Sequence, residues 1–121
     1  MRVLVCGGRD YNDREAVISV LSGIAGERMR PIETIIEGGA KGADASGRAY
    51  AYITDAECET YEADWKRFGN RAGPIRNQRM IDEGKPDLVV AFPGGRGTAD
   101  MVRRAKAAGV PVTLASGGDV G

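Results

Sequence analysis

Three short apolar runs in this chain each end in a glycine-rich segment, and each segment leads into a helical pattern. The runs are Val3 to Cys6, Thr34 to Glu37 and Leu88 to Phe92. The third shows no alternation of apolar and polar residues, which is typical of a strand buried on both faces of a parallel sheet. We expect it to be the central strand. Strands that alternate with helices through short connections predict a parallel sheet with helices on both faces.

Weaker patterns complete the predicted sheet and its helices. Further strands are expected at Cys58 to Tyr61 and at Val110 to Leu114, with 63–72 as a loop. Helices are expected from a capping box formed by Asn12 and Glu15 to about residue 30, over 44–53, from Gly73-Pro74 to about residue 84, and from residue 98 to a left-handed cap at Gly109. The fold class is thus a three-layer α/β/α Rossmann-like domain over residues 1–114, with a parallel sheet of about five strands. Residues 115–121 are expected to form a flexible tail.

The composition excludes several classes of function. Histidine is absent, which removes the Ser-His-Asp triad and most transition-metal sites, so catalysis would depend on carboxylates, arginines or backbone dipoles. Cys6 and Cys58 lack metal-ligand spacing and are expected to be buried, reduced thiols. Basic and acidic residues balance at 17 each, which disfavours nucleic acid as a partner. No apolar stretch is long enough for a membrane helix. We expect a cytoplasmic protein with no metal ion and no cofactor.

The three glycine-rich loops form the predicted binding site. Each loop leaves the carboxyl end of a strand, so all three should lie at the edge of the sheet where ligands bind in α/β folds. Glycine lets the backbone approach a ligand, and the amides and dipole at a helix N-terminus attract an anion such as phosphate. Walker and G-x-G-x-x-G patterns are absent, which disfavours ATP hydrolysis and ordinary NAD chemistry. The predicted ligand-binding residues of the loops are Gly7, Gly8, Arg9 and Asp10, then Gly38, Gly39, Gly42 and Asp44, and finally Pro93, Gly94, Gly95, Arg96, Gly97 and Thr98.

A basic segment adds two residues to this site. Five basic residues and no acidic one lie between Lys66 and Arg79, a concentration that suits a phosphate-bearing ligand. Arg76 lies in the first turn of its predicted helix, where the dipole opposes a cation, so a ligand phosphate would explain its position. The alternative is a surface arginine paired with a neighbouring carboxylate. Asn77 is equally compatible with recognition of a ribose hydroxyl or base edge and with a local cap.

Four residues near the loops have two interpretations each. Arg9 and Asp10 offer a ligand a donor and an acceptor, or they form an ion pair with each other. Asp44 complements the dipole of its helix, an interpretation that we favour over acceptance of bonds from ribose hydroxyls. Trp65 either stacks on a base or anchors the chain hydrophobically, and we favour the anchor because that is the commoner role of a lone tryptophan.

A longer pattern surrounds the third loop. Residues 87–98 read Asp-Leu-Val-Val-Ala-Phe-Pro-Gly-Gly-Arg-Gly-Thr, and Arg76-Asn77-x-x-Met80 precedes them. This pattern resembles the SLOG superfamily of nucleotide-binding Rossmann-like proteins. Further segments resemble its YspA-related branch, a domain of unknown function, so that the resemblance covers about residues 2–113: Gly7-x-Arg9-Asp10, Glu37-Gly38-Gly39-Ala40-x-Gly42-Ala43-Asp44, Ala63-Asp64-Trp65 and Ala72-Gly73-Pro74-x-Arg76-Asn77.

The resemblance implies three functions. The first, which we favour, is binding of a nucleotide-derived small molecule, such as an ADP-ribose-like or cyclic nucleotide signal, for sensing or sequestration. The third and least favoured is DprA-like binding of single-stranded DNA, since that function needs aromatic platforms and a basic groove. Superfamily relatives commonly pair through helices beside the ligand edge, so the resemblance also implies a homodimer or higher homo-oligomer.

The second function is hydrolysis of the N-glycosidic bond of nucleoside 5′-monophosphates, as in LOG enzymes. Those enzymes share the Pro-Gly-Gly-x-Gly-Thr loop, and Arg76 matches the arginine that they keep beside the ribose and phosphate. Their catalytic glutamate is replaced here by Met101. The candidate catalytic residues are therefore Asp100, as the carboxylate that would stabilise an oxocarbenium-like transition state, and Arg76, which would hold the 5′-phosphate. One residue turns a helical side chain by about 100°, so Asp100 cannot simply take the glutamate's place.

Overall fold

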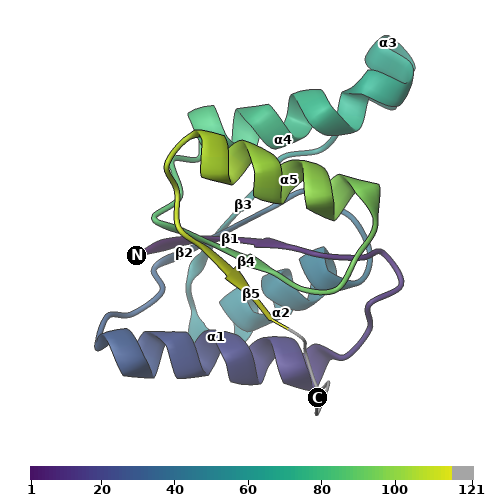
Figure 1. Ribbon diagram of the computed structural model, residues 1–121. Helices are drawn as coiled ribbons and strands as arrows, with labels where there is room; N and C mark the ends of the chain where they lie inside the picture. The colour runs from purple at the N-terminus through teal and green to yellow at the C-terminus, as the bar shows by residue number, and fades with distance from the viewer. Residues whose placement is uncertain (116–121) are drawn as a thin grey trace.

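Five parallel strands form one sheet within residues 1–115, which are the residues that the computed structural model describes (Figure 1). The spatial order is β3-β2-β1-β4-β5, with every neighbouring pair parallel. The tail predicted for residues 115–121 lies outside the described residues, apart from Ala115. The strands are β1 (Arg2–Cys6), β2 (Thr34–Glu37), β3 (Glu57–Thr60), β4 (Leu88–Ala91) and β5 (Val112–Leu114).

The central strand is β1, and our expectation that the Leu88 run is central was wrong. β1 pairs with β2 on one side and with β4 on the other. Both β1 and β4 are buried along nearly their whole length. An unbroken apolar run predicts burial on both faces, which every interior strand of a covered parallel sheet has, so this pattern alone does not rank the interior strands.

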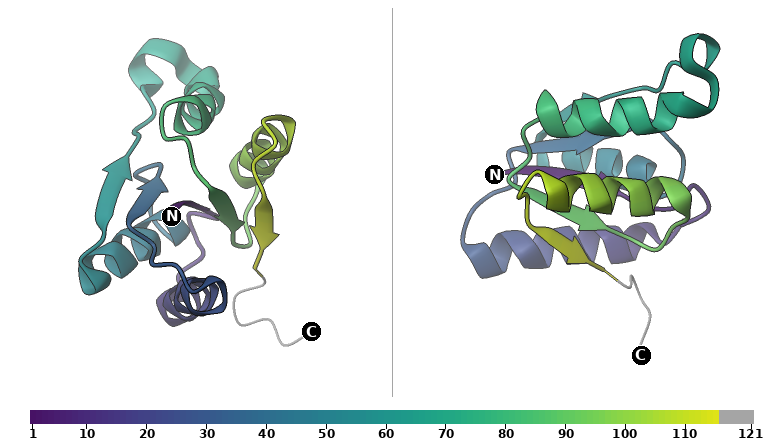
Figure 2. Two further views of the ribbon diagram at one scale, coloured as in Figure 1. Left: turned by 90° about the vertical axis from the view of Figure 1, so that its left-hand side faces the viewer. Right: turned by 45° about the horizontal axis from the view of Figure 1, so that its top comes forward.

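Helices cover both faces of the sheet (Figures 1 and 2). One apolar core lies on the side of α1 (Arg14–Arg28) and α2 (Ala43–Thr54), with Leu21 and Tyr50 packed against the strands. The other core lies on the side of α4 (Ala72–Asp82) and α5 (Arg96–Ala107), with Met80 and Met101 buried. The three-layer α/β/α Rossmann-like fold is therefore confirmed. None of the helices in residues 1–115 is long and apolar enough to cross a membrane.

Local details differ from the sequence prediction at three places. The N-cap of α1 is Asp13, whose side chain accepts a bond from the amide of Ala16 at 3.1 Å, so the predicted box was placed one residue early. The predicted loop over 63–72 contains the short helix α3 (Trp65–Phe68) and a 3₁₀ turn (Gly69–Arg71). Cys58 is exposed, because β3 is an edge strand, whereas Cys6 is buried as expected.

The fold brings the three glycine-rich loops to one edge. β1, β2 and β4 are adjacent and parallel, so their carboxyl ends point the same way. The loops that follow these strands lie together on the right-hand side of the sheet in Figure 1, where α2 and α5 begin. The short helix α3 extends beyond α4 on that same side.

Candidate functional site

The first glycine-rich loop is held between the other two. The amide of Gly8 donates to the carbonyl of Pro93 at 2.8 Å, and the amide of Ala43 donates to the carbonyl of Gly8 at 3.2 Å. A Cβ atom at Gly94 would lie 2.6 Å from the amide nitrogen of Gly8, so only glycine permits this approach without a shift of the backbone. The three loops therefore pack against one another as one unit.

This unit forms one wall of a cleft of about 1410 Å³, and α4 and α3 supply the opposite wall. Of the residues predicted to bind a ligand, Gly42 alone does not line the cleft, because it packs against the backbone of the first loop. The residues that line it are Gly7, Gly8, Arg9, Asp10, Gly38, Gly39, Asp44, Arg76, Asn77 and the six residues 93–98, and Asp100 lines it as well.

The amides of the second loop are occupied by the protein's own carboxylates. Asp44 Oδ2 accepts bonds from the amides of Gly38 at 3.1 Å and Ala40 at 3.2 Å. Glu37 Oε1 accepts from the amide of Gly39 at 2.7 Å. These three amides cannot also bind a ligand anion. Asp44 does lie in the first turn of α2, as the dipole interpretation requires, but its oxygen also closes this loop.

Burial changes the acidity of the Asp44 carboxyl group. Its desolvation raises its pKa to about 6, and the charge of Glu37 adds to the rise. The amides of Ala40 and Gly38 and the charge of Arg76 act in the opposite direction. Asp44 therefore carries a titratable charge at the cleft near neutral pH.

Glu37 is a structural residue that the sequence did not single out. It is fully buried, and it accepts hydrogen bonds from Arg48 on α2, Thr60 on β3 and the amide of Gly39. These bonds tie the end of β2 to its neighbours and fix the start of the second loop. The available signal was a carboxylate at the end of an apolar strand, directly before Gly38-Gly39. Such a residue is buried only when it is paired.

The third loop leaves its amides open. The N-cap of α5 is Gly95, and no side chain caps this helix. Within residues 1–115 the amides of Arg96, Gly97 and Thr98 find no acceptor, as expected for the first turn of an uncapped helix. These residues line the cleft, and apart from adjacent residues and the backbone of α5 itself no atom of residues 1–115 lies within 4 Å of a Cβ built at Gly95 or Gly97. The positive end of α5 therefore faces open space.

Arg76 lies across the cleft without an ion pair. Its Nη1 donates to the carbonyl of Gly38 at 2.7 Å, and its Nε donates to Asn77 Oδ1 at 3.0 Å. No carboxylate in the described part of the chain lies within ion-pair distance of it, so the predicted alternative of a paired surface arginine is not observed. Arg9 and Asp10 are exposed and do not pair with each other. Arg79 does form a pair, with Glu83.

Asn77 and Asp100 form a buried link between α4 and α5. Asn77 Nδ2 donates to the carbonyl of Gly97 at 3.2 Å and to Asp100 Oδ2 at 3.0 Å, so its amide group bridges two helices and does not cap its own helix locally. Asp100 also accepts from Arg103 at 2.5 Å and from Arg104 at 2.8 Å. Burial raises the pKa of Asp100, but the bonds from Arg104 and Asn77 outweigh burial and hold it below the ordinary value. Asp100 is thus ionised at neutral pH, with both oxygens occupied.

Trp65 is not the hydrophobic anchor that we favoured. Its residue surface is 56% exposed, and it lines the cleft at the end formed by α3. The chain around it turns outward before α4 begins, so the ring does not reach either apolar core.

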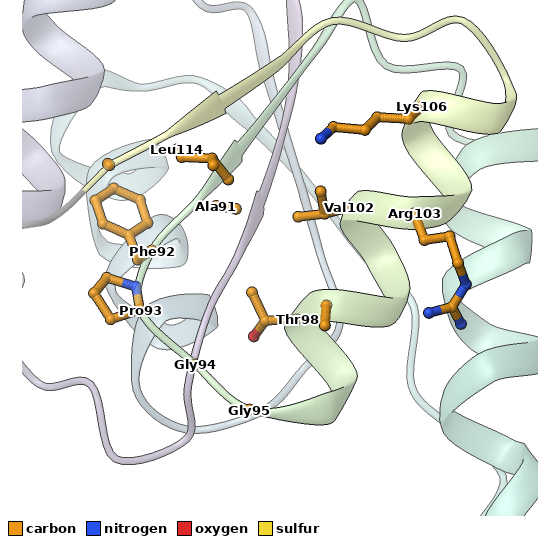
Figure 3. A pocket seen from close by; sticks show the side chains of 12 residues that line it. Ala91, Phe92, Pro93, Gly94, Gly95, Thr98, Val102, Arg103, Lys106 and Leu114 are labelled. Carbon is orange, nitrogen blue, oxygen red and sulfur yellow. The ribbon is translucent and has the colours of Figure 1, made fainter.

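A second cavity of about 600 Å³ lies beside the third loop (Figure 3). Figure 3 shows Val102 and Thr98 on the α5 side of this cavity and Leu114 on the β5 side. It shares six lining residues with the larger cleft: Pro93, Gly94, Gly95, Thr98, Ala99 and Arg103. Neither Arg76 nor the first two loops contribute to it, so the predicted site corresponds to the larger cleft.

Comparison with known proteins finds a matching family and a similar protein. The model of the YspA, cpYpsA-related SLOG family matches residues 1–68. The Gene 61 protein of Mycobacterium phage D29 is 36% identical over 118 residues, which is 92% of this chain and 93% of that protein.

Two solved structures share the fold at lower identity. The structural-genomics target TM1055 superposes with a TM-score of 0.64 at 19% identity, over 93% of this chain and 72% of that chain. Glycinamide ribonucleotide transformylase 1 from Symbiobacterium toebii gives a TM-score of 0.52 at 16% identity, over 86% of this chain and 47% of that chain.

Proposed function

Because the chain belongs to the YspA, cpYpsA-related SLOG family, we propose that it binds a phosphate-bearing small molecule derived from a nucleotide. The ligand is a signal of the ADP-ribose or cyclic nucleotide type, which the protein senses or sequesters. Its phosphate lies at the N-terminus of α5 and accepts bonds from the amides of Arg96, Gly97 and Thr98. Arg76 neutralises the phosphate from across the cleft.

The observation that carries this proposal is the difference between the second and third loops. Asp44 and Glu37 occupy the amides of the second loop, whereas within the described residues nothing occupies those at the start of α5. Open amides at a helix N-terminus favour an anion, and they favour it more strongly beside cations without a carboxylate partner. Arg76 and the exposed Arg9 and Arg96 line this cleft and form no ion pair with any carboxylate of residues 1–115.

Binding without turnover fits the surroundings of Asp100 better than hydrolysis does. A carboxylate that stabilises an oxocarbenium-like transition state must present an oxygen to the sugar. Both oxygens of Asp100 are instead taken up by hydrogen bonds from Arg103, Arg104 and Asn77. We therefore assign Asp100 to the packing of α5 against α4.

Replacement of Arg76 by alanine should weaken nucleotide binding by about 10- to 100-fold, since a charge-assisted bond contributes about 1.5–3 kcal/mol. Titration calorimetry with AMP and with ADP-ribose measures the change. Arg79→Ala is the matched control, because Arg79 lies on the same helix but is exposed and paired with Glu83. Equal affinities of wild type and Arg76→Ala for every nucleotide that binds would contradict the proposed role of Arg76. The loss of the bond to Gly38 should leave a folded protein, as a thermal melt would show.

A further inference from the structure

We infer that Trp65 is the stacking surface for the base of the bound nucleotide, so that the cleft selects ligands with an aromatic ring in addition to a phosphate. This inference rests on the proposed function. The same cleft is lined by the first turn of α5 with its open amides, by Arg76 on α4 and by Trp65 on α3.

The short helix that carries Trp65 is closed by hydrogen bonds at both ends. Asp64 Oδ1 accepts from the amide of Arg67 at 3.1 Å, and the carbonyl of Asp64 accepts from the amide of Phe68 at 3.0 Å. The amide of Gly69 donates back to the carbonyl of Trp65. These bonds fix the backbone at Trp65, although no residue of α3 is buried. The indole is thus exposed to solvent on a backbone that hydrogen bonds hold in place.

Gly73 provides room for the indole against α4. Trp65 Cη2 lies 3.4 Å from the position that a Cβ at residue 73 would take, so the edge of the ring rests on the first turn of this helix. Within the described residues, no aromatic ring pairs with the indole and no cation lies over it. More than half of the residue's surface remains accessible. A planar group that enters the cleft can therefore use this surface.

The position of the indole relative to Arg76 suits a nucleotide. Gly73 and Arg76 both line the cleft and are three residues apart, which is about 4.5 Å along a helix axis. A ligand that stacks on Trp65 can therefore present its phosphate to Arg76 and to the start of α5. Base stacking on an aromatic side chain tolerates any base, because every base has a π-face.

Trp65 is the one tryptophan in the chain, so tryptophan fluorescence reports this residue alone. We would titrate the protein with AMP, with ADP-ribose and with ribose 5-phosphate, which has the phosphate but no base. AMP and ADP-ribose should change the fluorescence, and ribose 5-phosphate should bind by calorimetry without such a change. Trp65→Ala should weaken AMP binding about tenfold and leave ribose 5-phosphate binding within about twofold. Trp65→Phe, which keeps an aromatic ring, should restore most of the affinity for AMP.

Tyr52→Ala is the control for loss of an exposed aromatic residue, since Tyr52 is 89% exposed and lies outside the cleft. If Trp65→Ala weakens AMP and ribose 5-phosphate equally, or weakens neither, Trp65 is not the stacking surface, while the proposed function stands on the binding itself. If none of the three compounds binds, both the stacking role and the proposed function are wrong.

Discussion

Replacement of Gly42 by alanine is expected to destabilise the protein by about 3–5 kcal/mol, from backbone strain and steric overlap together. Gly42 has a φ of 73°, a conformation that L side chains rarely adopt. Its Cβ would overlap the carbonyl oxygen of Gly8 and lie 2.6 Å from that of Arg9. Both contacts are with backbone, which cannot rotate away as a side chain can. The first loop would have to leave its place between the other two.

Urea unfolding of Gly42→Ala and Gly69→Ala separates strain from overlap. Gly69 also has a positive φ, of 56°, but outside its own turn no atom of the described residues lies within 4 Å of a Cβ built there. Gly69→Ala therefore carries the strain alone and should lose only about 1–2 kcal/mol. Equal losses for the two variants would mean that the loops do not pack as described. Gly42→Ala should also weaken AMP binding, because the loops that form the cleft would shift.

Ionisation of Asp44 is expected to lower the free energy of unfolding of the wild-type protein by about 3 kcal/mol at neutral pH, and Asp44→Asn should remove this loss. The pKa of Asp44 is about 6 in the folded protein, against an ordinary value of 3.8. The folded state therefore holds this proton more tightly than the unfolded state does. The contribution of Asp44 to stability is greatest below about pH 4 and declines as the pH rises through about 6. Asparagine stays neutral throughout and keeps an oxygen for the amides of Gly38 and Ala40.

The measurement is the free energy of urea unfolding of wild type and Asp44→Asn at several values between about pH 4 and pH 7. The stability of the variant minus that of the wild type should increase with pH over this range. Asp55→Asn is the matched control, since Asp55 caps the other end of α2 and its positive φ of 61° is well tolerated by asparagine. A difference that is independent of pH, or that decreases with pH, would show that Asp44 is not a desolvated carboxylate bound to the loop.

The sequence predicted the sheet, the loops and the edge that they share, because these depend on local patterns. Apolar runs such as Leu88 to Phe92 predict strands, and glycines directly after them predict turns into helices. The left-handed position at Gly109, with a φ of 75°, was likewise visible as a glycine at the end of a helical pattern. The order of the strands was not visible, since it depends on pairing between distant segments.

The state of the loop amides could not be predicted from the sequence. Gly38 to Gly42 and Gly94 to Gly97 are both glycine-rich segments before a helix, so both predict an anion site. They differ because Asp44 folds back on its own loop, whereas Asp100 is drawn away by Arg103 and Arg104. Asp44 is the second residue of its helix and Asp100 the fifth of its own, and only the tertiary contacts decide which amides each carboxylate meets. The exposure of Trp65 could not be predicted from the sequence either, because it also depends on tertiary structure.

The most direct test of anion binding at α5 is an NMR titration of the ¹⁵N-labelled protein with ADP-ribose. The amide signals of Arg96, Gly97 and Thr98 should show the largest shifts, because their N–H groups gain a charged acceptor. Signals of Gly38, Gly39 and Ala40 should move less, since Asp44 and Glu37 already hold these amides. Saturable shifts centred on the second loop, or no shift at residues 96–98 when the ligand is bound, would contradict the account.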